Sequence, residues 1–505
     1  MIKVVSLDNM RKSDAYTIKS GVPSRELMYR ASKGIFDSVK WWGKIAIICG
    51  KGNNGGDGYA LATILKEKSF EVDVYMVESP VTPDGIYYRD LCIKMGISVS
   101  LLKADTPLRQ YNVLVDCIFG TGFSGAVLEP YKTAIEKINN SRAYVVSADI
   151  NSGLNGDSGL GELAVVSNLT VAIGEYKSGH FLGQAKDYIG QLVRCDIGIE
   201  IQDTPYYLIE KSDTGSLLFK RMHYSHKGSY GYLALIGGSI EYSGAIKLAN
   251  LASSAVSCGA GVVMLAVAES LARAVAPYLL ESTLYPLEDN GNGHIQFDQE
   301  EIEILCHRTK AIGVGMGIGC TKDTQLLVEY LLKNYEGKLL IDADGLNALS
   351  FMDLDLLKIS SADIVLTPHL KEMERLCGKP SYEIEKNPVL VAKEFAKEYG
   401  VVLVLKGPTT IITDGENVYF SDTGSPAMAK GGSGDVLSGI ITAFLASAEG
   451  RSALESAYLG TYVNGLAGEL AELSHSQITA TPRDTVKYVP LAIEDIIRSN
   501  MQKKA

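Results

Sequence analysis

Short apolar runs alternate with longer segments of helical periodicity along most of the chain. From Lys44 to Gly198 each run is followed by a turn rich in glycine or aspartate; the runs are KIAIICG, VDVYMV, NVLVDCIFGTG, AYVVSADINSG and NLTVAIG. Strands that alternate with helices at this spacing are typical of a parallel sheet covered by helices on both faces. The pattern therefore predicts an αβα domain, in which ligands bind beyond the carboxyl ends of the strands.

The pattern lapses and then restarts near the middle of the chain. Polar and glycine residues dominate around IEKSDTGSLLFKRMHYSHKGSYG, and the runs that follow are GYLALIGGS, GVVMLAV, AIGVGMG, KLLIDADG, ADIVLTPH, VVLVLKGP and TTIITDG. We therefore predict two αβα domains, residues 1–211 and 212–505. Ahead of the first run the sequence predicts two helices for core or subunit packing. The apolar residues at near-helical spacing there are Leu27, Met28, Ala31, Ile35 and Val39.

Composition narrows the class of protein. A chain of 505 residues is too long for one ordinary core. A net charge of −11 argues against a protein that binds the phosphate backbone of nucleic acids, and the apolar runs end well before the ~20 residues of a membrane span. The eight cysteines form no C-x-x-C pair and the first residues lack a secretory pattern. We expect a cytoplasmic protein without a zinc site or a disulfide framework.

Two glycine-rich loops follow apolar runs in the first domain. The loop GKGNNG fits the G-x-G-x-x-G template from Gly50, and GTGFSG fits it from Gly120. Such glycines let backbone N–H groups approach a phosphate at a helix start, but they equally serve as simple turn formers. A nicotinamide dehydrogenase would need an acidic residue at the end of the second strand. Only Glu78 fits that position, and loosely, which weakens the dehydrogenase interpretation.

Small polar side chains also gather at three strand ends of the first domain. They are Asn53, Asn54 and Asp57 after the first run, Asp116 after another, and Asp149 with Ser152 after a third. These ends converge in a parallel sheet, and amide, carboxylate and hydroxyl oxygens together suit a hard cation or a polyol. The alternative role of each residue is to cap the helix that follows.

A second dense loop, SPAMAKGGSGDVLSGIITAFLA, leads into an apolar helix of the second domain. Gly431, Gly432 and Gly434 leave free N–H groups at the helix start, which can receive the charge of a transferring phosphoryl group. Asp435 beside them can take a hydroxyl proton as a general base, or it simply interacts with the helix dipole. The spacing is not that of a Walker loop.

Three further turns of the second domain carry polar groups. KGPTTIITDG offers Lys406 and two threonines, LTPHLKEMERL offers His369 and Glu372, and DADGLNAL offers Asp342, Asp344 and Asn347. A single histidine in such a place is more often a packing residue than a catalyst. Several polar turns at strand ends of one domain nevertheless favour a site.

Taken in order, these motifs resemble those of bifunctional NAD(P)HX repair enzymes, which fuse an NAD(P)HX epimerase domain to an NAD(P)HX dehydratase domain. The resemblance covers nearly the whole chain, and the motifs are NNGGDGY, DCIFGTG, DINSGLNGDSG, HKGSYGYLALIGGS, DADGLNAL, TPHLKEMERL, LKGPTT and KGGSGDVLSGII. It implies an α/β fold with a Rossmann-like first domain and a ribokinase-like second domain. NAD(P)HX is NADH or NADPH damaged by addition of water across a double bond of the nicotinamide ring.

The resemblance also implies roles for individual residues. In the first domain the hydrated nucleotide would contact Asn53, Asn54, Gly55, Gly56, Asp57, Gly120, Thr121, Gly122, Phe123, Ser124, Gly125, Ala126 and Asp149. A potassium ion would be held by Asn54, Asp116 and Ser152. In the second domain the hydrated nucleotide would contact Ala245, Gly317, His369 and Asp435. ADP would be held by Lys406, Gly407, Pro408, Thr409, Thr410 and Gly434.

The implied reactions are epimerisation of the R and S hydrates and dehydration of the S hydrate at the expense of ADP, with Mg²⁺. Asp149 is the best-placed acid or base for the first reaction, and Asp435 would be the base of the second. We expect a homo-oligomer that acts on NADHX and NADPHX, with no nucleic-acid or membrane partner. The chief alternative is a small-molecule kinase of the ribokinase-like type fused to a nucleotide-binding domain. A non-catalytic scaffold is a further alternative, and the two aspartates argue against it.

Overall fold

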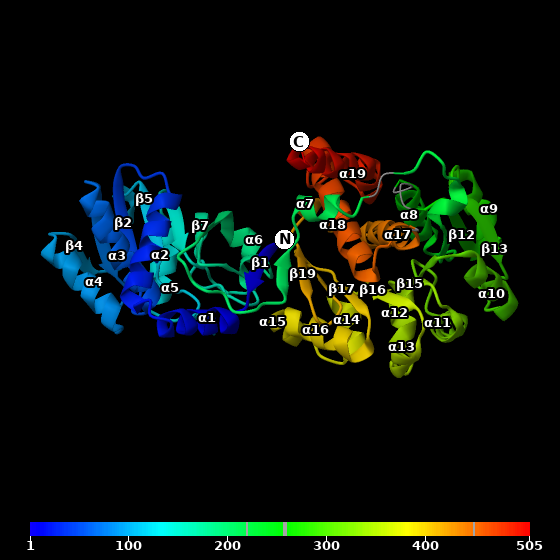
Figure 1. Cartoon of the computed structure of the whole chain (residues 1–505), viewed down its shortest axis with the longest axis horizontal. Coiled ribbons are helices and arrows are strands. Elements are labelled where there is room, and N and C mark those ends of the chain that lie inside the picture. The colour runs from blue at the N-terminus through cyan, green and yellow to red at the C-terminus, as the bar shows by residue number, and fades with distance from the viewer. Residues whose placement is uncertain (219–220, 256–259, 448–449, 505) are drawn as a thin grey trace. The chain divides into compact units, whose positions relative to one another are not determined.

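The computed structural model describes residues 1–218, 221–255, 260–447 and 450–504. The chain forms two compact units, one of residues 3–204 and one of residues 1–2 with 205–505 (Figure 1). The division lies between Thr204 and Pro205, a few residues before the expected boundary at Lys211. The reason is β10 (Tyr206–Leu208), which pairs with β19 (Val418–Ser421) and so belongs to the second unit.

The first unit is built on a parallel sheet with the strand order β4-β3-β2-β5-β6-β7-β9. The strands are β2 (Lys44–Cys49), β3 (Glu71–Met76), β4 (Ser98–Leu101), β5 (Val113–Cys117), β6 (Tyr144–Ala148), β7 (Ser167–Ile173) and β9 (Ile189–Cys195). The chain runs outward from β2 to β4 and then returns to β5 beside β2, so the strand order reverses between these two strands. In an open α/β sheet that reversal is where ligands bind. A short parallel pair, β1 (Ile2–Val5) with β8 (Tyr176–Lys177), lies outside this sheet.

Alternation along the strands divides the core of the first unit between the two faces of the sheet. Ile45, Ile47 and Cys49 of β2 belong to one buried cluster, whereas Ala46 and Ile48 belong to another. The first cluster includes side chains of α2, α3 and α4, and the second includes side chains of α5. The helices are α1 (Leu7–Lys19), α2 (Ser24–Ser38), α3 (Asn53–Glu67), α4 (Pro83–Lys94), α5 (Tyr131–Asn139) and α6 (Ala185–Tyr188). The prediction of a doubly covered parallel sheet is confirmed.

The second unit contains a larger sheet with the strand order β13-β12-β11-β14-β15-β16-β17-β18-β19-β10. Its strands beyond β10 and β19 are β11 (Tyr232–Ile236), β12 (Val262–Ala268), β13 (Thr283–Leu287), β14 (Ala311–Val314), β15 (Lys338–Ile341), β16 (Asp363–Leu366), β17 (Val402–Leu405) and β18 (Thr410–Thr413). The pairs from β13 to β17 are parallel. The run TTIITDG instead forms β18, which pairs antiparallel with both β17 and β19. Two tight connections therefore replace the helical crossovers that the repeated pattern predicts.

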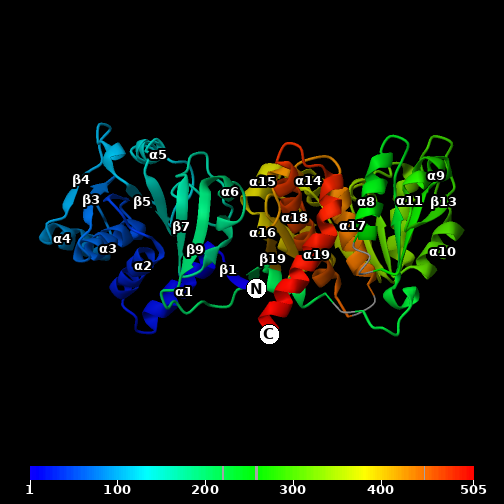
Figure 2. The same ribbon diagram turned by 90° about the horizontal axis from the view of Figure 1, so that it is seen from above.

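Helices cover both faces of the second sheet. α17 (Ser433–Ala446) packs on β14 and lies between α8 (Ser243–Ala255) and α18 (Ala453–His475), and α19 (Pro482–Lys504) runs along α18 (Figure 2). In Figure 1 α11, α13, α14 and α16 lie on the opposite side of the strands from α17 and α18. The remaining helices are α7 (Lys211–Gly215), α9 (Glu269–Val275), α10 (Gln299–Arg308), α11 (Lys322–Asn334), α12 (Asp344–Leu349), α13 (Asp355–Ile359), α14 (Leu370–Cys377), α15 (Ser381–Lys386) and α16 (Pro388–Tyr399). In the part of the chain that the structure describes, no helix combines the length and the hydropathy of a membrane span.

Candidate active sites

A cavity of about 660 Å³ lies in the first unit, beyond the ends of β2 and β5 where the strand order reverses. The expected residues on its wall are Asn53, Asn54, Asp57, Gly120, Thr121, Gly122, Phe123, Ser124 and Asp149. Gly125 and Ala126 continue the same loop beyond the lining residues. Asp14 of α1 and Lys177 of β8 also line the cavity, and sequence analysis singled out neither of them. The strand ends that the sequence pattern brings together therefore do surround one space.

Close packing explains most glycines of the first loop. A Cβ atom on Gly50 would lie 2.0 Å from the carbonyl oxygen of Ile118, and one on Gly55 would lie 2.0 Å from the carbonyl oxygen of Gly50. A Cβ atom on Gly56 would overlap the side chain of Met28 at 2.5 Å. Gly52, by contrast, has open space where a Cβ would be, and it caps α3 without a side chain. Gly52 thus leaves room at the helix start, where free N–H groups attract an anion.

Asn54, Asp116 and Ser152 form one buried cluster around the backbone of Phe119. The Asn54 amide donates to the Phe119 carbonyl at 2.7 Å, and the Ser152 hydroxyl accepts from the Phe119 N–H at 2.8 Å. The Asp116 carboxylate accepts from the hydroxyl of Ser152 at 2.5 Å and from its N–H at 2.9 Å. Burial raises the pKa of Asp116, while these hydrogen bonds oppose the rise. Asp116 therefore braces the Ser152 loop, and the cluster caps no helix.

One atom of this cluster has unused capacity to accept. The side-chain oxygen of Asn54 is buried and has no hydrogen-bond partner among the residues that the structure describes. A buried acceptor without a partner is costly. Together with the neighbouring carbonyl, hydroxyl and carboxylate oxygens, it makes an oxygen-only group that suits a hard cation such as K⁺.

Asp149 is held in an unusual conformation at the end of β6. Its φ is +68°, a region that residues other than glycine rarely adopt. The carboxylate accepts from the N–H of Ile173 at 3.2 Å and forms an ion pair with Lys177, whose side chain is only 1% exposed. The Lys177 ammonium also donates to the Ile173 carbonyl at 2.7 Å. Asp149 thus belongs to a buried ion pair. Its contacts in the described part of the chain are not those of a residue that caps a helix.

His180 secures the backbone of both partners of this ion pair. Its Nδ1 accepts from the Lys177 N–H at 3.0 Å, so Nε2 carries the proton and donates to the Asp149 carbonyl at 2.7 Å. Burial, with the charge of Lys177, lowers the pKa of His180 to about 4. His180 is therefore neutral near pH 7 and serves as a structural link.

Two more carboxyl groups face the Lys177 ammonium. Burial is the main cause that raises the pKa of Asp14 to about 6, and Asp149 adds to the rise while Lys177 opposes it. Burial, followed by the charges of Asp149 and Asp14, raises the pKa of Asp57 well above its ordinary range. The Lys177 ammonium thus interacts with three carboxyl groups, those of Asp149, Asp14 and Asp57.

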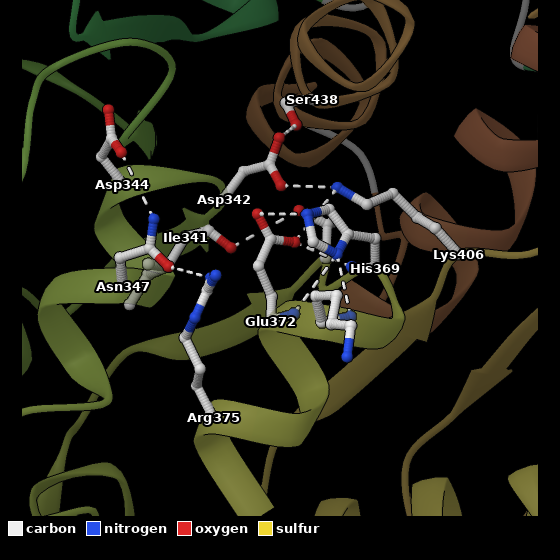
Figure 3. A network of polar contacts seen from close by, with 11 residues as sticks. Ile341, Asp342, Asp344, Asn347, His369, Glu372, Arg375, Lys406 and Ser438 are labelled. Atoms are coloured by element: carbon white, nitrogen blue, oxygen red, sulfur yellow. Dashed lines mark hydrogen bonds and ion pairs between the residues drawn. The ribbon is translucent and has the colours of Figure 1, made fainter. Parts of the chain in front are cut away.

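The second site lies beyond the strands of the larger sheet and is centred on Asp342 and Lys406 (Figure 3). Asp342 directly follows β15 and is 1% exposed. Its two carboxylate oxygens accept from the Lys406 ammonium at 2.9 Å and from the Ser438 hydroxyl at 2.6 Å. Burial alone would raise the pKa of Asp342, but the charge of Lys406 and the Ser438 hydrogen bond outweigh burial and lower it. Asp342 is therefore a buried carboxylate.

Glu372 and His369 form the other side of the Lys406 pocket. Glu372 lies 3.7 Å from the Lys406 ammonium and accepts from the N–H of His369 at 2.8 Å. The Nδ1 of His369 accepts from the N–H groups of Lys371 and Glu372, which caps α14. Burial raises the pKa of Glu372 to about 7 and lowers the pKa of His369. His369 is a capping residue whose imidazole is half exposed, at 51%, and can also reach a ligand.

Asp435 lies in the first turn of α17 and is half-buried. Its carboxylate makes no hydrogen bond to any residue that the structure describes, and Gly432 caps the helix without a side chain. Burial, then the charge of Asp342, raises the pKa of Asp435 to about 7; Asp344 adds to the rise and Lys406 opposes it. A capping carboxylate accepts from a backbone N–H, which Asp435 does not do within the described residues, whereas its place in the first turn still suits an interaction with the helix dipole.

The other expected residues of the second domain lie on neighbouring loops. Gly317 has φ +65°, and a Cβ atom on it would lie 2.9 Å from the Cβ of Ala245. The loop of Gly317 joins the turn after β15 through the N–H of Gly319, which donates to Asp344 at 2.9 Å. The residues expected to hold ADP run from the end of β17 to the start of β18 and are Lys406, Gly407, Pro408, Thr409 and Thr410. A Cβ atom on Gly434 would lie 3.5 Å from the Lys406 ammonium, so these two expected residues are adjacent.

These two strand-end sites define the chain as a two-unit α/β protein, with buried carboxyl groups and a lysine in the first unit and a carboxylate beside a lysine at a helix start in the second. A family model described as YjeF-related protein N-terminus matches residues 24–179, and a model described as NAD(P)H-hydrate dehydratase matches residues 233–491. The fold of the second unit is similar to that of a ribokinase-like superfamily protein from Enterococcus faecalis, with a TM-score of 0.50 and 23% identity over 59% of this chain and 98% of that one. This structural likeness shows the fold alone.

Curated relatives match nearly the whole chain. A bifunctional NAD(P)H-hydrate repair enzyme from Dictyoglomus turgidum is 34% identical over 471 residues, which are 90% of each chain. The enzyme of the same description from Archaeoglobus fulgidus is 34% identical over 500 residues, 97% of this chain and 99% of that one. The protein belongs to the family of bifunctional NAD(P)H-hydrate repair enzymes.

Proposed function

We propose that the first unit epimerises the R and S hydrates of NADH and NADPH and that the second unit dehydrates the S hydrate at the expense of ADP. Membership of the repair family supports both reactions. The observation that carries the second is the Asp435 carboxylate at the start of α17, next to the residue that faces Lys406 and without a hydrogen bond to any described residue. Damage produces both epimers, so an enzyme that accepts one of them gains from an attached epimerase.

In the dehydration, Asp435 takes the proton of the ring hydroxyl as that oxygen attacks the terminal phosphorus of ADP. The new O–P bond forms while the bond to the leaving AMP breaks, and the charge on the transferring group is stabilised by Lys406 and the N–H groups of α17. Phosphate then leaves with the C–O electron pair, expelled by the lone pair of the ring nitrogen. Loss of a proton from the adjacent carbon restores the dihydronicotinamide.

Metal ions enter this proposal in two ways. No group of three His, Cys, Asp or Glu side chains is placed to hold a metal within the described ranges of the chain, so we propose that Mg²⁺ arrives on the phosphates of ADP. For K⁺, the Asn54 oxygen without a partner supports a site at Asn54, Asp116 and Ser152. When bound, the ion would supply positive charge near the nucleotide loop, and the protein groups fix the loop backbone.

For the epimerisation we propose acid–base chemistry at Asp149 and Lys177. The ring nitrogen lone pair expels the hydroxyl group, which leaves as water after it takes a proton. Water then adds to the other face of the resulting C=N bond and gives its proton back to the protein, so the net change is inversion alone. The buried ion pair of Asp149 with Lys177 supports this assignment, because it places a proton acceptor and a proton donor on the cavity wall.

A product assay separates this function from the kinase alternative. Hydrated NADH, ADP and Mg²⁺ are incubated with the enzyme, and the nicotinamide absorbance is followed together with AMP and phosphate. We expect absorbance to return with one AMP and one phosphate for each NADH. A stable phosphorylated product without recovered absorbance would support the kinase, and binding without turnover would support the scaffold.

The ADP preference, the cytoplasmic location and the homo-oligomer stay predictions. A higher kcat/KM with ATP than with ADP in the same assay would contradict the ADP preference. Light scattering of the purified chain tests the homo-oligomer.

A further inference from the structure

The Lys406 ammonium lies between two carboxyl groups, one in the turn after β15 and one in the first turn of α14. Asp342 lies at 2.9 Å and Glu372 at 3.7 Å, and both side chains are more than nine-tenths buried. Burial alone would lower the pKa of Lys406, but the charges of Asp342 and Glu372 outweigh burial and raise it. Lys406 therefore keeps its charge beside two buried carboxyl groups, with its own side chain 19% exposed.

Asp342 is the more firmly fixed of the two carboxyl groups. Its second oxygen accepts from Ser438, one turn into α17, and its N–H donates to the Val314 carbonyl at 3.1 Å. The next residue, Ala343, has φ +48°, which turns the chain sharply into α12. A Cβ atom on Gly315 would lie 2.0 Å from the Asp342 carbonyl, so the loop after β14 also packs tightly on this turn.

The fixed carboxylate places the ammonium at one end of α17. The ammonium faces Gly434, where a Cβ atom would lie 3.5 Å away, and Asp435 is the next residue. Figure 3 shows Lys406 pointing toward Asp342, with Ser438 on the other side of the carboxylate. Asp342 therefore links the lysine of the β17 loop to the helix that carries the proposed base.

We propose that Asp342 is a positioning residue of the dehydratase site, whose carboxylate holds the Lys406 ammonium beside the start of α17 and keeps it from pairing with Asp435. This inference rests on the proposed function of the second unit. A phosphoryl group at the helix start would then meet a lysine already in place, while the Asp435 carboxylate stays free to accept a proton.

The charges around Lys406 explain why its ammonium group needs a fixed carboxylate partner. Besides Asp342, the carboxyl groups that interact with the ammonium are Glu372 and Asp435, and an ion pair with Asp435 would make that carboxylate a weaker base. The groups that face Asp435 from the neighbouring elements are Asp342, Asp344 and Lys406. In this proposal, removal of the Asp342 charge lowers the pKa of Asp435 chiefly because Lys406 becomes free to pair with it.

The test uses the full-length chain with the single variants Asp342→Asn and Lys406→Gln and the double variant. We expect Asp342→Asn to lower the kcat of dehydration by roughly 10-fold to 100-fold, as misplaced catalytic groups do. We expect the double variant to be no slower than Lys406→Gln within about 2-fold, because a residue that acts through another adds nothing once its partner is gone. The acid limb of the pH profile of Asp342→Asn should move to lower pH.

The matched control is Asp355→Asn. Asp355 forms an exposed ion pair with Lys358 at 2.7 Å on α13, so this variant loses the same kind of contact on the surface. Dehydration by this control should equal that of the unmodified chain. Epimerisation is measured on every variant and should be unchanged, because all these substitutions lie in the second unit.

The outcomes separate the two proposals. Unimpaired dehydration by Lys406→Gln would overturn the proposed function of the loop after β17, which is to bind the phosphoryl group. Impaired single variants whose losses multiply in the double variant, or an acid limb that does not move, would overturn the positioning role alone. If Asp342→Asn fails to fold, Ser438→Ala is the deciding variant, because it removes only the hydrogen bond from the Ser438 hydroxyl to the Asp342 carboxylate. A lowered kcat of dehydration supports the inference, and an unchanged kcat overturns it.

Discussion

Asp435 has two possible roles, a carboxylate that interacts with the helix dipole and a general base. Both roles place a carboxylate in the first turn of a helix, so the sequence alone could not separate them. The structure leaves the carboxylate without a hydrogen bond within the described part of the chain and places Lys406 near it. A carboxylate that makes no hydrogen bond to the protein keeps its oxygens available to accept a proton from a substrate.

The substitution Asp435→Asn isolates the proton acceptor. Asparagine keeps the size of the side chain and removes its basicity, so dehydration should fall by roughly 100-fold to 10,000-fold. ADP should still bind, because Lys406 and the N–H groups remain, and epimerisation should be unchanged. Steady-state rates and calorimetric titration with ADP check this, and near-normal dehydration would return Asp435 to a structural role.

The rate of dehydration should depend on pH through the same residue. The pKa of Asp435 is raised to about 7, from an ordinary value of 3.8. Asp435 must be deprotonated to act as a base, so kcat should rise as pH rises through about 7 and become constant above it. A limb near pH 4 would show an unperturbed carboxylate and contradict the proposed environment.

Lys177 should affect both the stability and the activity of the first unit. Lys177→Met keeps the apolar stem but leaves Asp149 as a buried charge without its partner, which costs roughly 3–5 kcal/mol of unfolding free energy. Epimerisation should be lost. Adding Asp149→Asn should recover stability but not activity, and thermal melts with epimer analysis check both. A double variant that is less stable than Lys177→Met would contradict a paired charge.

At the scale of elements, the apolar pattern was enough to predict the central strands. Runs such as KIAIICG and KLLIDADG are buried strands β2 and β15, because strands covered on both faces need continuous apolar sequence. Short strands such as β8 and β10 contain two or three residues and give no periodic signal. The antiparallel direction of β18 was also not predictable from its composition, which is that of any buried strand.

The residues of the two candidate sites could be predicted where they lie in loops at strand ends, and were missed elsewhere. Residues at strand ends were found because parallel strands bring those ends together. Asp14 and Lys177 were missed, since one lies within a helix and the other on a two-residue strand, and neither belongs to a glycine-rich motif. Asp342 and Lys406 were both noted as polar turns, but their contact spans 64 positions and depends on the pairing of β15 to β17.

The loop after β14 offers a test at this scale. Gly317 has φ +65°, and a Cβ atom there would lie 2.7 Å from the carbonyl oxygen of Tyr242 and 2.9 Å from the Cβ of Ala245. Gly317→Ala should therefore displace the start of α8 and raise the KM for the hydrated nucleotide in dehydration. Gly291→Ala is a matched control with φ +80° and open space around it. Equal effects of the two variants would indicate backbone strain alone.

At the scale of the whole molecule, the chain divides into two compact units, and each unit contains one of the two candidate sites. Among the described residues, three buried clusters of the first unit consist of residues before Pro205. The loops around Asp342 and Asp435 come only from residues after it. Each activity should therefore survive separation of the units.

The position of the cut decides whether that separation succeeds. Fragments 1–204 and 205–505 should be folded and should carry epimerisation and dehydration, respectively. A fragment 212–505, cut at the boundary expected from sequence, lacks β10, whose register pairs Tyr206 with Val418 and Leu208 with Phe420. It also loses the stacked rings of Tyr207 and Tyr419, 5.7 Å apart, and leaves the edge of β19 unpaired. Exposed strand edges favour aggregation, so we expect 212–505 to melt at a lower temperature and to aggregate more than 205–505.

Thermal melts and light scattering of the two fragments measure this difference, and the rate of dehydration shows whether the site of each fragment is intact. Equal melting temperatures would show that β10 adds nothing to the second unit, and loss of dehydration in a folded 205–505 would show that its site needs residues of the first.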